Sequence, residues 1–138
     1  MKDSARILLV EDNEQNAYLV RFLLEQAVMA VTTAMTGTEG LRIARENSHD
    51  LILLDIQLPE IDGYQIAATL RGDSSFKLVP LIALTSFAMP GERQRAVDAG
   101  CNGYIEKPIA PLKFVEQVRS FLASNDRHPD EPRGDNPA

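Results

Sequence analysis

The chain of 138 residues is poor in cysteine and in aromatic residues, and it has no long apolar run. A single cysteine, Cys101, excludes an internal disulfide and a cysteine-based zinc site, and it favours a reducing compartment. No stretch approaches the roughly 18 apolar residues of a membrane span, and the N-terminus lacks the apolar region of a signal peptide. The net charge of −6 argues against a protein that binds nucleic-acid backbones. We therefore expect a cytoplasmic protein that binds neither nucleic acid nor membrane.

Short apolar runs alternate with amphipathic segments along the chain, which predicts a parallel sheet wrapped by helices. Strands are predicted at 7–10, 30–34, 51–54, 81–84 and 103–106, and a helix is predicted after each strand. The first, third and fourth runs are the most uniformly apolar, so we place them at the centre of the sheet. This arrangement and right-handed crossovers give the strand order 2-1-3-4-5. The sequence thus predicts an α/β fold of the flavodoxin-like (βα)5 type, with a doubly wound, parallel, five-stranded sheet.

Several residues mark where the predicted helices begin and end. Thr36, with Glu39 three residues later, is typical of a capping box. Pro90 suits the first turn of the fourth helix, and Gly100 is well placed to end it. That helix has few apolar residues, so we expect it to be the least firmly docked of the five.

The last helix should run from Pro111 to about Ala123. From residue 124 onward the chain has three prolines and no large apolar residue, which predicts a flexible acidic tail. We therefore divide the chain into one folded domain over 1–123 and a tail over 124–138.

Polar residues stand at the carboxyl ends of four predicted strands. Glu11 and Asp12 follow the first strand and Asp55 ends the third, while Thr85 ends the fourth and Lys107 follows the fifth. In an open parallel sheet, these ends meet at one rim beside the point where the strand order reverses. Clustered carboxylates repel one another unless a cation joins them, and oxygen ligands favour Mg²⁺. A lysine and a hydroxyl beside them predict a site for a phosphoryl group, with Asp55 as the nucleophile.

Each of these residues also has an ordinary structural explanation. Glu11 and Asp12 could cap a helix, Asp55 could start a turn, Thr85 could simply favour a strand, and Lys107 could be a loop charge. What these explanations do not predict is all five residues at the correct strand ends together. The joint pattern therefore favours the functional interpretation.

Four motifs, ILLVEDN, LILLDIQLPEIDG, LIALTS and GYIEKPI, resemble the signatures of the receiver domain of bacterial two-component response regulators, in the CheY-like superfamily. The resemblance extends from residue 6 to about 123. It implies that Asp55 accepts a phosphoryl group from a sensor histidine kinase or a phosphotransfer protein. It further implies that Asp12, Asp55 and the carbonyl of Gln57 bind Mg²⁺, with Glu11 acting through a water molecule.

The resemblance also implies how the signal is passed on. Thr85 and Lys107 would bind phosphoryl oxygens, and Tyr104 would turn inward as Thr85 moves. The Lys107–Pro108 bond matches a cis peptide of the family, and bulky Phe87 predicts a long-lived phosphoryl group. The face formed by the fourth helix, the fifth strand and the fifth helix would then bind a downstream protein or a kinase, and the chain itself would be a monomer or a weak homodimer.

Two alternatives remain at this point. A phosphatase of the haloacid-dehalogenase type also uses an aspartate at a strand end with Mg²⁺, but it normally needs a second acid where this chain has Gln57. A receiver-like interaction module that is never phosphorylated would not need all five site residues. We therefore expect a stand-alone phosphorylatable switch rather than an enzyme acting on other substrates.

Overall fold

The computed structural model describes residues 4–86 and 90–124. Strands and helices alternate along the chain, with one short 3₁₀ helix (η1) before the fourth strand. The elements are β1 (Arg6–Val10), α1 (Glu14–Gln26), β2 (Ala30–Ala34), α2 (Gly37–Glu46), β3 (Leu51–Asp55), α3 (Gly63–Arg71), η1 (Ser74–Phe76), β4 (Leu81–Thr85), α4 (Glu92–Ala99), β5 (Gly103–Glu106) and α5 (Pro111–Ser124). None of the helices within these described residues is long and apolar enough to cross a bilayer.

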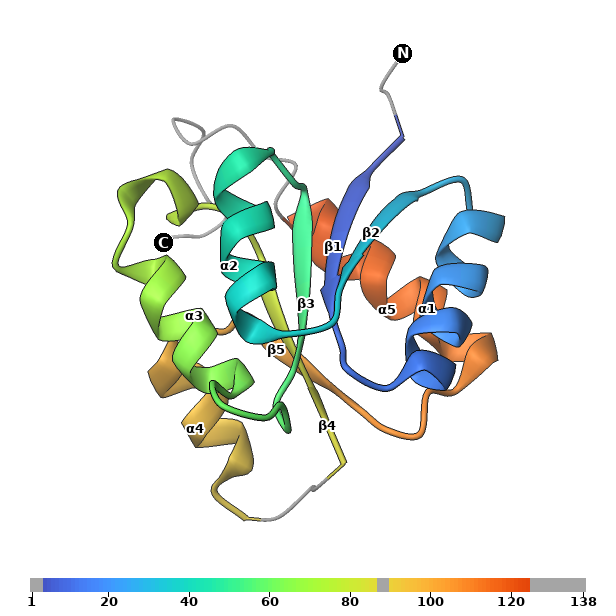
Figure 1. Cartoon of the computed structure of the whole chain (residues 1–138). Coiled ribbons are helices and arrows are strands. Elements are labelled where there is room, and N and C mark those ends of the chain that lie inside the picture. The colour runs from blue at the N-terminus through green and yellow to red at the C-terminus, as the bar shows by residue number, and fades with distance from the viewer. Residues whose placement is uncertain (1–3, 87–89, 125–138) are drawn as a thin grey trace.

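The five strands form one parallel sheet in the order β2-β1-β3-β4-β5. This confirms the predicted doubly wound α/β fold and its strand order. Figure 1 shows the sheet between two layers of helices, with α1 and α5 on one side and α2, α3 and α4 on the other. The predicted tail from residue 125 onward lies outside the described residues, and α5 extends to Ser124.

The core follows the two-residue period of the strands, because successive side chains point to opposite faces of the sheet. In β1, Ile7 and Leu9 pack with α1 and α5, whereas Leu8 and Val10 pack with α2 and α3. All five residues of β3 and all five of β4 are buried, as expected for central strands covered on both faces. The apolar runs that predicted the strands therefore also build both halves of the core.

The predicted capping box of α2 closes one residue earlier than the sequence suggested. Thr36 Oγ1 accepts a hydrogen bond from the backbone N–H of Glu39 at 3.1 Å, as expected. The Glu39 carboxylate, however, accepts from the N–H of Met35 at 3.1 Å rather than from that of Thr36. Both contacts still satisfy backbone donors at the start of the helix.

The start of α4 differs from the prediction. The helix begins at Glu92, because Gly91 has a left-handed backbone (φ 95°) and separates Pro90 from the helix. Gly100, also left-handed (φ 101°), ends the helix as predicted. Ala96 is the buried residue of this helix, so its weak apolar docking agrees with the sequence.

Arg71, the last residue of α3, ties several elements together at the amino-terminal ends of β4 and β5. Its guanidinium donates to the carbonyls of Gly100 (2.8 Å) and Val79 (2.8 Å) and to the side chain of Asn102 (2.6 Å). The same Asn102 oxygen accepts from the N–H of Leu81 at 2.8 Å. Burial lowers the pKa of Arg71, and these oxygens compensate for the water that the guanidinium has lost.

Candidate functional site

Strand register brings the predicted site residues to one edge of the sheet. Val10 pairs with Leu54, so Glu11 follows β1 at the level of Asp55, the last residue of β3. Thr85 pairs with Glu106, so Lys107 follows β5 just beyond Thr85. The parallel pairing therefore places residues from four segments at the carboxyl ends of neighbouring strands.

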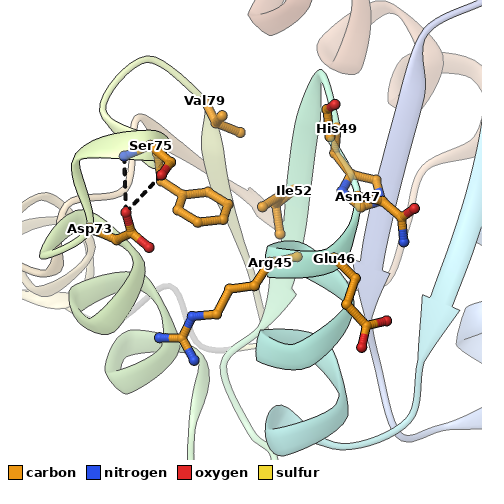
Figure 2. A pocket seen from close by; sticks show the side chains of 11 residues that line it. Arg45, Glu46, Asn47, His49, Ile52, Asp73, Ser75 and Val79 are labelled. Carbon is orange, nitrogen blue, oxygen red and sulfur yellow. Dashed lines mark hydrogen bonds between the residues drawn. The ribbon is translucent and has the colours of Figure 1, made fainter.

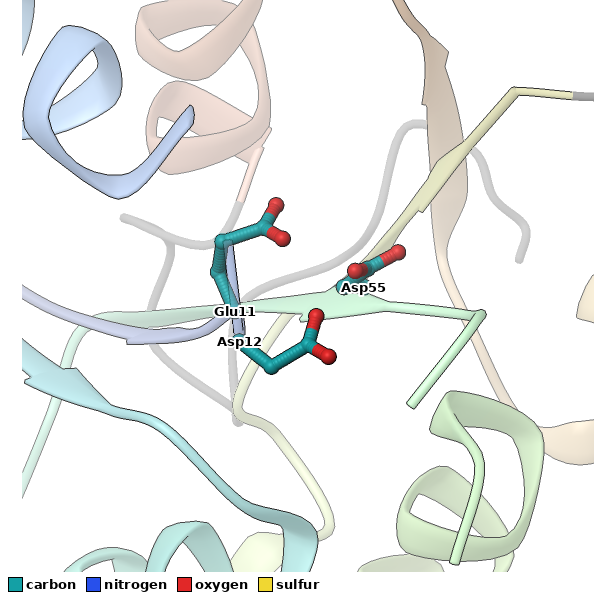
Figure 3. A group of neighbouring side chains, drawn as sticks. All are labelled: Glu11, Asp12 and Asp55. Carbon is teal, nitrogen blue, oxygen red and sulfur yellow. The ribbon is translucent and has the colours of Figure 1, made fainter. Parts of the chain in front are cut away.

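Three carboxylates meet at this edge. Single oxygens of Glu11, Asp12 and Asp55 all lie within 4.8 Å of one another, and Figure 3 shows the three side chains gathered around one space. Glu11 (1% exposed) and Asp55 (3% exposed) are buried, whereas Asp12 is exposed. Among the described residues, this is the one group of three or more acidic, histidine or cysteine side chains arranged to hold a metal ion.

Lys107 points into the acidic group. Its Nζ lies 3.1 Å from Glu11 Oε1 and 3.2 Å from Asp55 Oδ1. The backbone N–H of Lys107 donates to the Thr85 carbonyl at 2.8 Å, which extends the β4–β5 pairing to the start of this loop. The Lys107–Pro108 peptide is cis, as the resemblance implied. The site thus has a cation held against two buried acids.

The proximity of the acids changes the ionisation of Glu11. Burial, the hydrogen bond with Asp55 and the charge of Asp55 raise the pKa of Glu11 to about 7, and Lys107 offsets part of this. When Lys107 alone compensates the negative charge of the cluster, Glu11 is therefore partly protonated near neutral pH. A divalent cation at this point would favour the ionised form.

The donor set fits Mg²⁺. Glu11 Oε1 is buried and has no well-aligned hydrogen-bond donor among the described residues, although Lys107 Nζ lies nearby. Backbone N–H groups of Asn13 and Gln57 donate to the other Glu11 oxygen and to Asp55 Oδ1, both at 3.2 Å, which fixes the carboxylates. Oriented oxygen ligands beside an open, water-accessible space are the donors that Mg²⁺ prefers.

The space in front of the acids is large enough for a cation and a phosphoryl group. An open cavity of about 530 Å³ is lined by Glu11, Asp12, Asn13, Asn16, Asp55, Gln57, Ser86, Lys107 and Pro108. Sequence reasoning missed Asn16 and Ser86 as lining residues. A signal for Asn16 was present, because it stands three residues after the helix cap Asn13 and so lies on the same side of the first turn of α1.

Gly63 is another residue whose role was missed. A Cβ atom at this position would lie 2.5 Å from the Asp55 carbonyl oxygen and 2.9 Å from Ile56 Cδ1. The absence of a side chain lets the first turn of α3 pack directly against the end of β3. Gly63 thus helps to fix the backbone that carries Asp55.

The other predicted site residues are placed as follows. Thr85 is buried at the end of β4, and the backbone of exposed Gln57 is hydrogen-bonded to Asp55. Tyr104, on β5, is half-buried and accepts a hydrogen bond from Arg93 at 3.0 Å. Phe87 lies outside the described residues. The individual roles given to these residues remain predictions.

A second cavity, of about 620 Å³, opens at the opposite end of the strands, between the end of α2 and the α3–β4 connection. Figure 2 shows Arg45, His49 and Asp73 around it, with Asp73 hydrogen-bonded to Ser75. Burial lowers the pKa of His49, and its Nδ1 has no partner among the described residues. This second cavity therefore lies away from the acidic site, at the other end of the sheet.

Comparisons with known proteins agree with this geometry. The family model of the response regulator receiver domain matches residues 7–119. The chain is 42% identical over 116 residues to the polar-differentiation response regulator DivK of Brucella ovis, covering 84% of this chain and 94% of that protein. DivK of Brucella anthropi gives the same identity and coverage. A similarity to DivK was also expected from residues 46–60 and 86–89, and it is confirmed.

Solved structures show the same fold. A putative response regulator from Chloroflexus aurantiacus superposes with a TM-score of 0.84 at 30% identity, covering 88% of this chain and 99% of that one. The receiver domain of the sensor histidine kinase PA1611 from Pseudomonas aeruginosa gives 0.81 at 33% identity, with coverage of 88% and 99%, and is described with magnesium coordinated in its active-site cleft. The chemotaxis response regulator CheY4 of Vibrio cholerae gives 0.82 at 27% identity, with coverage of 86% and 98%.

The motif positions, the sheet order and these similarities lead to one conclusion. This chain belongs to the family of response regulator receiver domains.

Proposed function

We propose that this chain is an Mg²⁺-dependent receiver that accepts a phosphoryl group on Asp55 and signals by changing its affinity for partner proteins. The observation that supports this most is the placement of Lys107 Nζ within 3.2 Å of Asp55 at the mouth of the three-carboxylate cluster. A nucleophile, a metal-binding group and a cation for phosphoryl oxygens then share one cavity.

In the transfer step, an Asp55 carboxylate oxygen attacks the phosphorus atom of a phosphohistidine. The new O–P bond forms as the N–P bond breaks, and the electron pair of the broken bond stays on the imidazole nitrogen. Asp12, Asp55 and the Gln57 carbonyl would hold Mg²⁺, with Glu11 acting through water, and the bound ion would supply positive charge for the developing oxyanions. Lys107 exchanges part of its contact with Asp55 for a contact with a phosphoryl oxygen.

The signal follows from the new charge. Phosphorylation adds close to two negative charges and three acceptor oxygens at the cavity. Thr85 and Lys107 gain these oxygens as partners, and Tyr104 turns inward as Thr85 moves. The weakly docked α4 can then shift at low cost, which changes the face formed by α4, β5 and α5.

The partners are a sensor histidine kinase or a histidine phosphotransfer protein on one side and a downstream protein or an allosterically regulated kinase on the other. We propose that the chain acts in the cytoplasm as a monomer or a weak homodimer, without binding nucleic acid or membrane. The domain that ends with α5 at Ser124 performs these functions, and the segment 125–138 is an acidic tail. The chain catalyses only its own phosphorylation and dephosphorylation.

The test is incubation of the full chain with acetyl phosphate and Mg²⁺, followed by intact mass measurement. We expect one phosphoryl adduct per chain, which disappears in the Asp55→Asn variant and when a chelator removes the metal. Asp62→Asn is a matched control, because Asp62 is a helix cap near the site and asparagine caps helices equally well. This variant should be phosphorylated like the wild type.

The same experiment separates the alternatives. Continuous release of phosphate from phosphate esters, at a rate that depends on Asp55, would support a phosphatase. A chain that binds partners but forms no adduct, even with excess acetyl phosphate, would be an interaction module that is not phosphorylated.

A further inference from the structure

Helix α4 is attached to the rest of the domain mainly by polar contacts. Ala96 is its buried residue, whereas α1, α2 and α3 each bury several. The residue at its N-cap is Gly91, which has no side chain that could accept a capping hydrogen bond. Figure 1 shows α4 beside α3, on the same side of the sheet. What holds the first turn of α4 in place must therefore come from a neighbouring element.

Tyr64 of α3 supplies this attachment. Its side chain is 8% exposed and belongs to the core between the sheet and α3. Its hydroxyl donates a short hydrogen bond to the carboxylate of Glu92, the first residue of α4. The phenol is thus fixed at one end by the core and presents its other end to α4.

Arg95, one turn after Glu92 in α4, contacts both Tyr64 and Glu92. Its guanidinium carbon lies 4.4 Å from the centroid of the Tyr64 ring, within the range of a cation–π contact. Its Nη1 lies 3.9 Å from Glu92 Oε2. We call Tyr64, Glu92 and Arg95 the α3–α4 latch, since one aromatic side chain of α3 binds an anion and a cation of α4 together.

The Tyr64 hydroxyl remains a hydrogen-bond donor over the physiological pH range. Burial and the neighbouring carboxylate of Glu92 raise the pKa of the Tyr64 phenol, so the hydroxyl keeps its proton and remains a donor. A half-buried, charge-assisted hydrogen bond is stronger than a neutral one at the surface.

We propose that the α3–α4 latch is a built-in restraint that holds the first turn of α4 against α3 in the unphosphorylated state. The latch thereby opposes the change to the activated state and raises the level of phosphorylation at which the population of chains switches. This inference rests on the proposed function, because it concerns the movement of α4 that follows phosphorylation at Asp55. None of the three latch residues lines the acidic cavity. The latch regulates the switch without taking part in the transfer.

The position of the latch explains why it acts on one end of the helix. The C-terminal end of α4 is fixed separately, since the Gly100 carbonyl accepts a hydrogen bond from Arg71 at 2.8 Å. Glu92 is at the other end of the helix. The first turn of α4 can move away from α3 only if the contacts of Tyr64 with Glu92 and Arg95 are broken.

The first test compares Tyr64→Phe with Tyr18→Phe in the unphosphorylated protein. Both variants lose one phenolic hydroxyl, but Tyr18 is 70% exposed and stacks on Phe22 on the surface of α1. We expect amide hydrogen exchange of 92–99 to become at least about ten-fold faster in Tyr64→Phe, as a hydrogen bond to a charged group predicts. Exchange in α1 and α2 should be unchanged, and Tyr18→Phe should behave like the wild type.

The second test measures the switch itself, with beryllium trifluoride and Mg²⁺ as a non-covalent phosphoryl mimic. If the latch restrains the switch, Tyr64→Phe should change to the activated exchange pattern at an about ten-fold lower concentration of the mimic than the wild type. Glu92→Gln should have a smaller effect in the same direction. The effect of the double variant on this concentration should not exceed the sum of the two single effects, because both changes break the same hydrogen bond between Tyr64 and Glu92.

The outcomes separate the inference from the proposed function. Equal exchange of 92–99 in Tyr64→Phe and Tyr18→Phe would show that the latch does not hold α4, and an unchanged mimic concentration would show that it does not restrain the switch. Either result overturns the inference while leaving phosphorylation of Asp55 intact. A wild-type chain without any metal-dependent response to the mimic would instead overturn the proposed function, and with it the regulatory part of the inference.

Discussion

Lys107 Nζ lies 3.2 Å from Asp55 Oδ1, although the two residues stand 52 positions apart in the sequence, Asp55 at the end of β3 and Lys107 directly after β5. The same ammonium also contacts the buried carboxylate of Glu11 at 3.1 Å. A single cation therefore compensates two acids in the absence of metal, and this charge balance leads to two predictions.

The first prediction concerns Lys107→Met. Removing one partner of a buried ion pair leaves the other charge uncompensated. Because Glu11 can keep a proton, we expect the free energy of unfolding of the metal-free protein to fall by about 1–3 kcal/mol rather than more. Urea unfolding in a chelator at neutral pH measures this. Lys113→Met, an exposed change on α5, is the control and should have little effect.

The second prediction concerns pH. The pKa of Glu11 is raised from 4.5 to about 7 in the folded protein, with burial as the largest cause. Between these values the unfolded chain has already lost the proton that the folded chain retains, so the stability of the metal-free protein falls as pH rises through this window. The fall should be on the order of 1–3 kcal/mol.

Urea unfolding of the metal-free protein at several pH values between about 5 and 8 tests this sign. Glu11→Gln has no proton to lose and should show a flatter profile. A wild-type profile that rises over the same window would contradict the prediction. Addition of Mg²⁺ should restore stability most at the high end of the window, since the cation favours ionised carboxylates.

The third prediction uses Cys101, the single cysteine of the chain. Burial raises the pKa of its thiol from 9.0 to about 11, with Arg71 opposing part of the shift. At about pH 8 the folded protein then has about a hundred-fold less thiolate than the unfolded chain, and burial also limits access. We expect a thiol reagent to react slowly with the native protein and rapidly in concentrated urea. Fast native labelling would show that the α4–β5 connection opens frequently.

The fourth prediction compares two helix ends. Val28 follows α1 with a left-handed backbone (φ 65°), and its N–H and that of Met29 donate to the carbonyls of Glu25 and Leu24, both at 3.0 Å. This is a Schellman motif with valine where glycine is preferred. Val28→Gly should raise the free energy of unfolding by about 0.5–1 kcal/mol, because a β-branched residue is strained in this conformation and Val28 is exposed.

Gly100 gives the opposite case. It has the same handedness (φ 101°), and a Cβ there would lie 2.4 Å from Arg71 Cγ. Gly100→Ala should therefore lower the free energy of unfolding by at least about 1–2 kcal/mol. Urea unfolding of both variants provides the comparison. If both changes have the same sign, the backbone conformation does not control these helix ends.

Most of the fold could be predicted because the local patterns and the global arrangement agree. The four-residue apolar runs at 51–54 and 81–84 could only be central strands, and this fixed where Asp55 and Thr85 come to lie. The beginning of α4 was predicted two residues early. Proline suits a first turn, but Gly91 adopts a left-handed conformation that places Pro90 before the helix, and the local pattern did not indicate this.

Two other features could not be predicted for a related reason. Arg71 was not recognised, because its partners include backbone carbonyls that any sequence provides. The hydrogen bond from Tyr64 to Glu92 spans 28 positions, and an apolar pattern assigns Tyr64 only to the core. Within the candidate site, the strand ends predicted the acids and the lysine, while Ser86 depends on the shape of the cavity.

The fixed contact between Arg71 and Gly100 has a mechanical consequence. It makes the C-terminal end of α4 a pivot, about which the first turn of the helix moves once the α3–α4 latch is broken. Under the proposed switch, displacement is smallest beside Arg71 and grows toward Glu92. A binding protein that contacts the beginning of this helix therefore meets the largest change, whereas one that contacts the end of the helix beside Arg71 meets nearly the same surface in both states.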